Sequence, residues 1–287
     1  MNSGSSWPEQ LDLDDPLRLV ECPAGPPPTG LRPLPPGGEL HPDQPVRPAP
    51  GVHWADCDGE LVALDLNTDR FVALGPYAST VATAALTSTA PPPADPQDRA
   101  VLDSLAERGL LVSGNGPVVV PATATRPGGV ATYTPRPRAG LTEAAHVVPP
   151  GPALLATATR HLRECDRQAR SGGLLGLTVR LRRDLATAPS RRRPFADPYR
   201  LVQAQLTVRR LLPQALHPMA PAAALARHAW QAGLPAVFVI GVQKFPFHTR
   251  AYVECDGRVL DDAQELREVL APVVVLGPPA VPMMGCP

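Results

Sequence analysis

Lysine is almost missing from this 287-residue chain, in which Lys244 is the only one. Arginine, alanine and proline abound instead. All three have GC-rich codons, so the bias reflects genomic base composition more than a role for arginine. The 27 basic and 27 acidic residues balance. No global charge therefore points to nucleic acid or to an anionic membrane surface as a partner.

Long hydrophobic runs are missing as well. A helix needs about 20 consecutive apolar residues to cross a bilayer, and no segment of the chain approaches that length. The N-terminus has no basic start followed by an apolar stretch, which is the pattern of a secretory signal. We therefore expect a cytoplasmic protein without a membrane partner.

Cysteines are few and odd in number, and no Cys-x-x-Cys motif occurs among them; they are Cys22, Cys57, Cys165, Cys255 and Cys286. This pattern predicts a reduced chain without disulfides, structural zinc or another cofactor. His53, Cys57 and Asp58 are close enough in sequence to suggest a metal site. They straddle an expected strand and turn and lack a second pair of ligands, so we predict no metal site there.

Composition divides the chain into four parts. Residues 1–50 hold about a third of all prolines, which predicts a disordered or extended tail. Within it, residues 11–20 have the apolar content to dock as a short strand or helix. Residues 51–113 form a first expected domain, 114–152 a linker rich in Pro, Gly, Thr and Ala, and 153–287 a second domain.

Residues 51–113 have the pattern of a small winged-helix-like unit. Two apolar segments flank Asp58-Gly59, a strong hairpin signal, and a third strand begins at Arg70 after a turn. Apolar residues at helical spacing follow over 76–86 and 96–109, and a glycine ends the second helix. Three strands followed by two helices give an α+β unit of this kind.

This run resembles the PqqD-like leader-recognition domain of peptide-modifying biosynthetic systems. The matching features are the strand–Asp-Gly–strand–turn–Arg-Phe-x-x-Leu run, the following Ser/Thr-Val helix and the closing Leu-x-x-Arg-Gly-Leu-Leu. The resemblance implies that a precursor's leader peptide adds as a strand to a sheet edge, with Arg70, Phe71, Val72 and Leu74 as leader-binding residues. The alternative is a folding unit that only packs on the rest of the chain.

Residues 153–212 have helical spacing in three pieces, broken near Gly172-Gly173 and near Pro189. A basic cluster flanks the second break and consists of Arg180, Arg182, Arg183, Arg191, Arg192 and Arg193. A solvated helix face is the first interpretation of this cluster. Contact with an acidic partner or with the leader is the second.

The segment from about Arg209 to Val275 resembles the lasso-peptide maturation B proteins, which are transglutaminase-like leader peptidases. The matching features are Arg210-Leu-Leu-Pro213, a helix ending in Ala-Gly-Leu-Pro-Ala236, Val239-Ile-Gly-Val242, Pro246-Phe247, Ala251-Tyr-Val-Glu254, Asp256-Gly-Arg-Val-Leu-Asp-Asp262 and Pro272-Val-Val-Val-Leu276. The resemblance implies a transglutaminase-like, papain-like cysteine protease fold for residues 153–287, and an α+β protein overall.

The resemblance also implies a catalytic triad, and its positions are substituted here. In that family a cysteine at the start of the central helix is the nucleophile, a strand histidine is the base, and an aspartate orients the histidine. These positions fall on Pro218, Arg250 and Asp262 (or its neighbour Asp261). Proline offers no nucleophile, and arginine stays protonated and cannot act as a base. Loss of the nucleophile alone typically costs about a millionfold in turnover, which predicts an inactive peptidase.

Displaced catalysis is the competing interpretation. His248 lies two residues before Arg250 and so faces the same side of the strand, which makes it the candidate for a relocated base. His217 adjoins the start of the helix. Neither histidine can replace the thiol nucleophile. The cysteines are poorly placed to do so, since Cys255 falls on the opposite face of that strand and Cys165 lies in a distant helix.

Three functions are compatible with these patterns. The first is a degenerate leader peptidase that binds the precursor leader, alongside an asparagine-synthetase-like cyclase, with a partly buried Arg250–Asp262 ion pair sealing the former site. The second is an active leader peptidase with relocated residues. The third is an unrelated two-domain protein that shares the fold, because a fold alone does not fix function.

Overall fold

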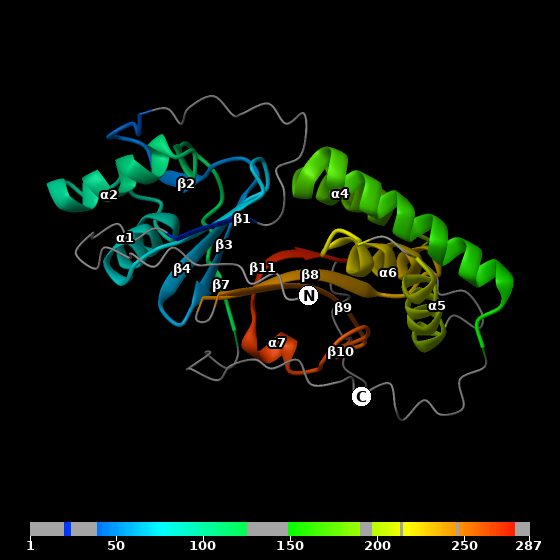
Figure 1. The fold of residues 1–287 in the computed structure, drawn as a ribbon. Helices are drawn as coiled ribbons and strands as arrows, with labels where there is room; N and C mark the ends of the chain where they lie inside the picture. Colours follow the sequence, from blue (N-terminus) through cyan, green and yellow to red (C-terminus); the bar gives the residue numbers. More distant parts are fainter. Residues whose placement is uncertain are drawn as a thin grey trace, which may run out of the picture.

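The computed structural model describes residues 20–23, 39–124, 149–189, 197–212, 215–244 and 247–278. Two β-sheets lie next to each other in the middle of the molecule, with helices α1 and α2 at one end and helices α4, α5 and α6 at the other (Figure 1). Strand β11 of the second sheet contacts β3 and β7 of the first. The N-terminal and C-terminal units are therefore packed against each other through their sheets.

The N-terminal unit has the predicted order of strands and helices. Its elements are β3 (Val52–Cys57), β4 (Glu60–Asp65), β5 (Arg70–Ala73), α1 (Pro76–Leu86), α2 (Pro96–Glu107) and β6 (Leu111–Ser113). Asp58 and Gly59 have φ of 63° and 82°, the left-handed pair that a two-residue hairpin needs. The hairpin prediction is confirmed, and β3 pairs antiparallel with β4.

Two segments of the proline-rich N-terminal region belong to this unit. Strand β1 (Val20–Pro23) pairs antiparallel with β5, and β2 (Val46–Pro48) pairs antiparallel with β6. Leu40 and Ala49 are 3% and 5% exposed. A tail boundary at residue 50 is therefore wrong, because the few apolar residues between the prolines reach the core. The prediction of disorder for 1–19 and 24–38 falls outside the described residues.

The expected linker is also partly structured. Strand β7 (Ala122–Thr123) runs parallel to β3 and completes a sheet of order β1-β5-β4-β3-β7. The amide of Val119 donates to the carbonyl of Leu86 at 3.1 Å. Residues 125–148 of the predicted linker lie outside the described part of the chain.

Both faces of the first sheet are buried. Leu61 and Ala63 of β4 pack in a cluster with α1 and α2. Val62 and Leu64 pack in a second cluster that includes the helices of the C-terminal unit. A strand buried on both sides needs an unbroken apolar run rather than alternation, which explains the composition of β4.

The C-terminal unit is an antiparallel sheet covered by helices. Its elements are α4 (Pro152–Ala186), α5 (Pro198–Leu211), α6 (Ala220–Gln231), β8 (Ala236–Gln243), β9 (His248–Cys255), β10 (Arg258–Val259), α7 (Leu266–Val269) and β11 (Ala271–Leu276), with sheet order β10-β9-β8-β11. Phe238 and Val253 belong to the cluster that contains α6. Val239 and Tyr252, on the other face, pack with α7 residues.

Helix α4 doubles back on itself at Gly173, which has φ 61° and ψ −165°. Arg227 pairs with both Glu164 and Asp184. In a straight helix those two carboxylates would lie about 30 Å apart, so residues 152–172 and 174–186 form two arms that face each other. The break predicted near Gly172-Gly173 is confirmed.

Polar contacts join the two units as well. Lys244 forms an ion pair with Glu60 and donates to the carbonyl of Leu74 at 2.6 Å. The amide of Leu174, which begins the second arm of α4, donates to Asp69 at 2.8 Å. Asp69 therefore caps a helix of the other unit, and the only lysine of the chain lies at the same boundary.

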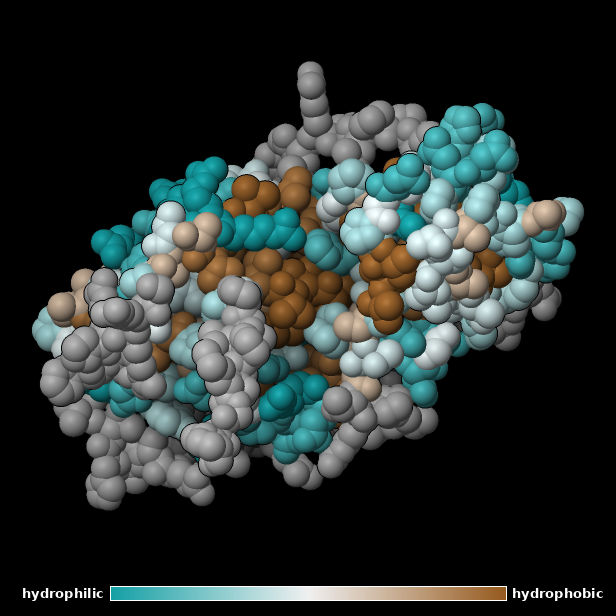
Figure 2. Space-filling view, turned by 180° about the vertical axis from the view of Figure 1, so that it is seen from behind, coloured by the Kyte–Doolittle hydropathy of each residue, from teal (hydrophilic) through white to brown (hydrophobic). Residues whose placement is uncertain are grey.

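Hydrophobic residues also reach the surface. The rear face of the molecule has hydrophobic residues near its middle with hydrophilic residues around them (Figure 2). Val120 and Val275 are 75% and 56% exposed. Among the helices that the structure describes, none has the length and apolar composition to cross a membrane.

Candidate functional site

The turn before α6 occupies the place expected for a nucleophile and carries none. Pro218 is exposed and lies directly before Met219, the N-cap of α6. The ring nitrogen Nδ1 of His217 accepts from the amide of Met219 at 3.3 Å, and the amide of His217 donates to Asp166 at 2.7 Å. Burial lowers the pKa of His217. The neutral ring therefore caps the helix rather than activating a neighbour.

Arg250 and Asp262 form the predicted ion pair. The Nε and Nη2 atoms of Arg250 both lie 2.6 Å from Oδ2 of Asp262, so the contact is not the two-oxygen fork of a bidentate pair. The arginine side chain is 44% exposed and that of Asp262 is 10% exposed. The pair exists, but the expected burial is wrong for the arginine, which lies near the start of β9.

His248 lies beside this pair. Burial lowers its pKa, the charge of Arg250 lowers it further, and the charge of Asp262 raises it. His248 and Arg250 lie two positions apart in β9, so strand alternation places them on the same side. A neutral imidazole next to a carboxylate is a competent base, but a base needs a nucleophile.

None of the described cysteine thiols supplies a nucleophile. Burial raises the pKa of both Cys57 and Cys165 to about 12, and the nucleophilic thiolate form is then negligible near neutral pH. Cys255 is buried, with its sulfur 3.8 Å from Asp256. A displaced cysteine nucleophile therefore has no support among these three residues.

The structure brings together some triad positions and separates another. Arg250, Asp262 and His248 form one group on the face of β9 that also carries Tyr252, toward α7. The neighbouring Ala251 points into the core that contains α6. In the described part of the chain, the turn that holds Pro218 forms hydrogen bonds with Asp166 and Arg170 of α4 and within itself.

Comparison with known families fits this arrangement of a central helix followed by antiparallel strands. Residues 160–275 match the model of the transglutaminase-like superfamily. This segment is a transglutaminase-like domain. Comparisons with curated proteins and with solved structures found no match. The matched segment begins within the first arm of α4, at residue 160, and includes all of α5. The domain therefore begins before the turn, strands and loop that carry the triad positions.

The predicted leader-binding residues lie on β5 and directly after it. Phe71, Val72 and Leu74 are at most 5% exposed, and Phe71 packs edge-on against Phe247 of the transglutaminase-like domain with ring centroids 5.6 Å apart. Only Arg70 is exposed. Their side chains therefore serve the core, and what β5 offers a peptide is its backbone edge, which β1 occupies.

The described residues contain no group that could form a metal centre. Across the described ranges, no three His, Cys, Asp or Glu side chains gather closely enough to hold an ion. His53 and Cys57 lie on β3, where burial lowers the pKa of the imidazole and raises that of the thiol.

Asp261, next to the Arg250–Asp262 pair, has a strongly perturbed carboxyl. Burial raises its pKa to about 6, the charge of Asp262 adds to the rise, and a hydrogen bond from the amide of Val253 at 3.2 Å opposes it. Perturbed carboxyls cluster at functional sites. Asp261 therefore marks a desolvated environment beside Asp262.

Replacing Asp261 with asparagine is expected to stabilise the protein above pH 6. The folded pKa, about 6, exceeds the ordinary 3.8, so the native state holds more protons between these values and stability falls as the pH rises through them. The full shift corresponds to at most about 3 kcal/mol. Denaturant melts at about pH 4 and about pH 7.5 should show a gain at the higher pH only, and equal gains at both would contradict the assignment.

Removing Arg250 is expected to cost little. Partly exposed ion pairs contribute about 1 kcal/mol or less, and the exposed arginine falls in this class. Melts of Arg250→Ala, Asp262→Ala and the double variant give the coupling energy directly. We expect a small, non-zero coupling. A loss above about 2 kcal/mol for Arg250→Ala would mean that the pair is effectively buried in solution.

Sequence reasoning missed one group of charged residues. Arg227 lies inside α6 among alanines, is 6% exposed, and pairs with two carboxylates of α4. An arginine at an apolar position of an otherwise buried helix was the available signal, since such a charge needs partners. The carboxylate partners of Arg227 depend on the doubling-back of α4, which local sequence patterns do not specify.

Proposed function

We propose that this protein binds the leader segment of a ribosomally made precursor peptide and does not cleave it. The leader adds as a strand to the outer edge of β5. A transglutaminase-like domain without nucleophile and base supports the first sheet. An asparagine-synthetase-like cyclase is the partner that the lasso-peptide resemblance implies.

The observation that carries this proposal is the pairing of β1 with β5. Four residues align antiparallel, from Val20 opposite Ala73 to Pro23 opposite Arg70. Strand addition uses backbone hydrogen bonds and so accepts many sequences. An edge that takes up an extended segment of its own chain is suited to take up an extended peptide, and the leader then displaces β1.

The residues at the expected triad positions support the claim that the protein does not cleave the leader. Pro218 cannot attack a peptide bond, and Arg250 cannot accept a proton. The described thiols have raised pKa values or lie buried. Peptide binding is the function that remains for a protein whose peptidase-like domain has lost its chemistry and whose other sheet has an edge, at β5, that pairs with an extended segment.

The test uses a synthetic leader peptide of a candidate precursor. Calorimetry measures its affinity for the full chain, and mass spectrometry follows the intact precursor for leader release. We expect binding without release. Absence of binding overturns the proposed function, whereas release that is lost in His248→Ala supports the active peptidase with relocated residues.

Two proline variants form a matched pair for the binding edge. Adjacent residues of a strand direct their N–H groups to opposite sides, so only one of Glu21→Pro and Cys22→Pro removes a hydrogen bond to β5. That variant should bind the leader more tightly than its partner, because β1 competes less. Equal affinities in both variants would show that the leader does not use this edge.

A further inference from the structure

We infer that the cavity between the two arms of α4 and helix α6 is a binding site for a small oxyanion, a carboxylate or a phosphate. This site lies apart from the Pro218 turn, from the Arg250–Asp262 pair and from the edge of β5. The inference goes beyond the proposed leader binding and does not depend on it.

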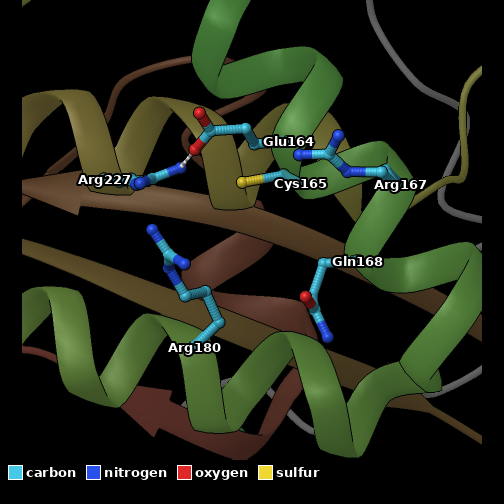
Figure 3. Close-up of a pocket in the computed structure, with 6 residues that line it drawn as sticks. All are labelled: Glu164, Cys165, Arg167, Gln168, Arg180 and Arg227. Atoms are coloured by element: carbon cyan, nitrogen blue, oxygen red, sulfur yellow. Dashed lines mark hydrogen bonds and ion pairs between the residues drawn. The ribbon is translucent and has the colours of Figure 1, made fainter.

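The cavity has a volume of about 180 Å³ and is lined by Glu164, Cys165, Arg167, Gln168, Arg180 and Arg227. Residues 164–168 come from the first arm of α4 and Arg180 from the second, and their side chains face each other across the space between the arms (Figure 3). Arg227 enters from α6. Positively charged groups thus reach the cavity from three helical segments.

The charges around the cavity do not balance. Arg180 pairs with Asp184, with Nε 3.1 Å from the carboxylate, and Arg227 is shared between Asp184 and Glu164. Three guanidinium groups therefore face two carboxylates. In the part of the chain that the structure describes, no hydrogen bond or ion pair engages Arg167. One positive charge at the cavity lacks a counter-charge.

The surroundings do not supply that counter-charge. Helix α4 carries seven arginines and three acidic residues. Its third acid, Asp166, is engaged by Arg170 at 3.0 Å and by the amide of His217. A locally positive cavity concentrates anions, and guanidinium groups match the planar or tetrahedral oxygens of carboxylate and phosphate.

Two features make the cavity a prepared site rather than a solvated gap. Arg227 has a side chain 7% exposed and is fixed by its two carboxylates, so its orientation costs a ligand no side-chain entropy. The amide of Gln168 lies against the second arm, where a Cβ at Gly176 would be 2.8 Å from its Nε2. Gly176 thus leaves space for a hydrogen-bonding side chain beside the cavity.

The size of the cavity limits the ligand. Pockets for drug-sized molecules measure about 300–1,000 Å³, and this cavity is smaller. It suits inorganic phosphate, a short carboxylic acid or one anionic group of a larger molecule. Chemistry at Cys165 is not part of the inference, because burial raises the pKa of that thiol to about 12.

The experiment titrates the full chain with inorganic phosphate and, separately, with acetate, by calorimetry at constant ionic strength kept with sodium chloride. Binding of either anion is expected, and the tighter one identifies the class. A charge-assisted hydrogen bond contributes about 1.5–3 kcal/mol, so Arg180→Gln and Arg167→Gln should each weaken binding about tenfold or more.

Arg183→Gln is the matched control, since Arg183 is an exposed arginine on the same arm as Arg180. It removes the same charge and should leave the affinity unchanged. Circular dichroism checks that each variant is folded. Failure of both anions to bind, or an equal loss in Arg183→Gln and Arg180→Gln, overturns the inference and reduces the cavity to a structural ion-pair network.

Discussion

Replacing Gly173 with alanine is expected to lower the free energy of unfolding by about 3 kcal/mol or more. The residue has φ 61° and ψ −165°, a region that essentially only glycine occupies. A Cβ there would also lie 2.5 Å from Oδ2 of Asp69. The substitution therefore strains the reversal of α4 and pushes away the side chain that caps its second arm across the boundary between the units.

Gly172→Ala provides the control for this experiment. Gly172 does not have a left-handed backbone, and its added Cβ would meet only the end of the Gln168 side chain. Alanine in a helix is favoured over glycine by up to about 1 kcal/mol, so this variant should be neutral or slightly stabilised. Denaturant melts compare the two variants. Similar losses in both would contradict the account of the helix reversal.

Replacing Arg227 with methionine is expected to cost about 3–5 kcal/mol. The methionine keeps much of the side-chain volume, so the change isolates the charge. It leaves Glu164 without its partner and leaves Asp184, which is 13% exposed, with only the exposed Arg180, and loss of a buried counter-charge is strongly destabilising. Loss of the link between the two arms of α4 adds to this effect.

Arg180→Met is the matched comparison, because it removes an arginine that pairs with the same Asp184 but is 41% exposed. Its cost should stay below about 1 kcal/mol. Adding Glu164→Gln and Asp184→Asn to Arg227→Met should recover part of the lost stability, since the only charge then left without its partner is that of the exposed Arg180. Equal melts for Arg180→Met and Arg227→Met would show that the network is solvated and not buried.

Local signals in the sequence predicted most of the elements. Asp58-Gly59 and Asp256-Gly257 adopt the left-handed turn conformations because these residue types tolerate positive φ beside a hairpin. Gly233, with φ 72°, ends α6 as expected. Each of these features depends on a few neighbouring residues, and pattern reasoning is most reliable there.

Features that depend on distant residues could not be predicted in this way. The pairing of β1 with β5 joins residues about fifty positions apart. The prolines around β2 predicted an extended tail, although β2 pairs with β6. The sequence also indicated a break in α4 but not its angle. Only the angle brings Glu164 and Asp184 to the same arginine.

The candidate site was predicted in outline only. Pro218 lies at the start of α6 and Arg250 reaches Asp262, as the resemblance implied. The exposure of Arg250 was not predicted, because it depends on where β9 ends relative to the helices. Asp262 contacts Arg250, whereas Asp261 accepts from the amide of Val253; the sequence does not distinguish these adjacent acids, because their orientation depends on how the loop folds.

Hydrogen exchange on the full chain, with and without the leader peptide, tests the central claim most directly. Leader addition to β5 must displace β1, so the amides of residues 20–22 should exchange faster while those of 70–73 stay protected by the new strand. The leader's own amides should gain protection in the same sample. Binding of the leader with unchanged exchange at residues 20–22, or faster exchange at 70–73, would contradict strand addition at this edge.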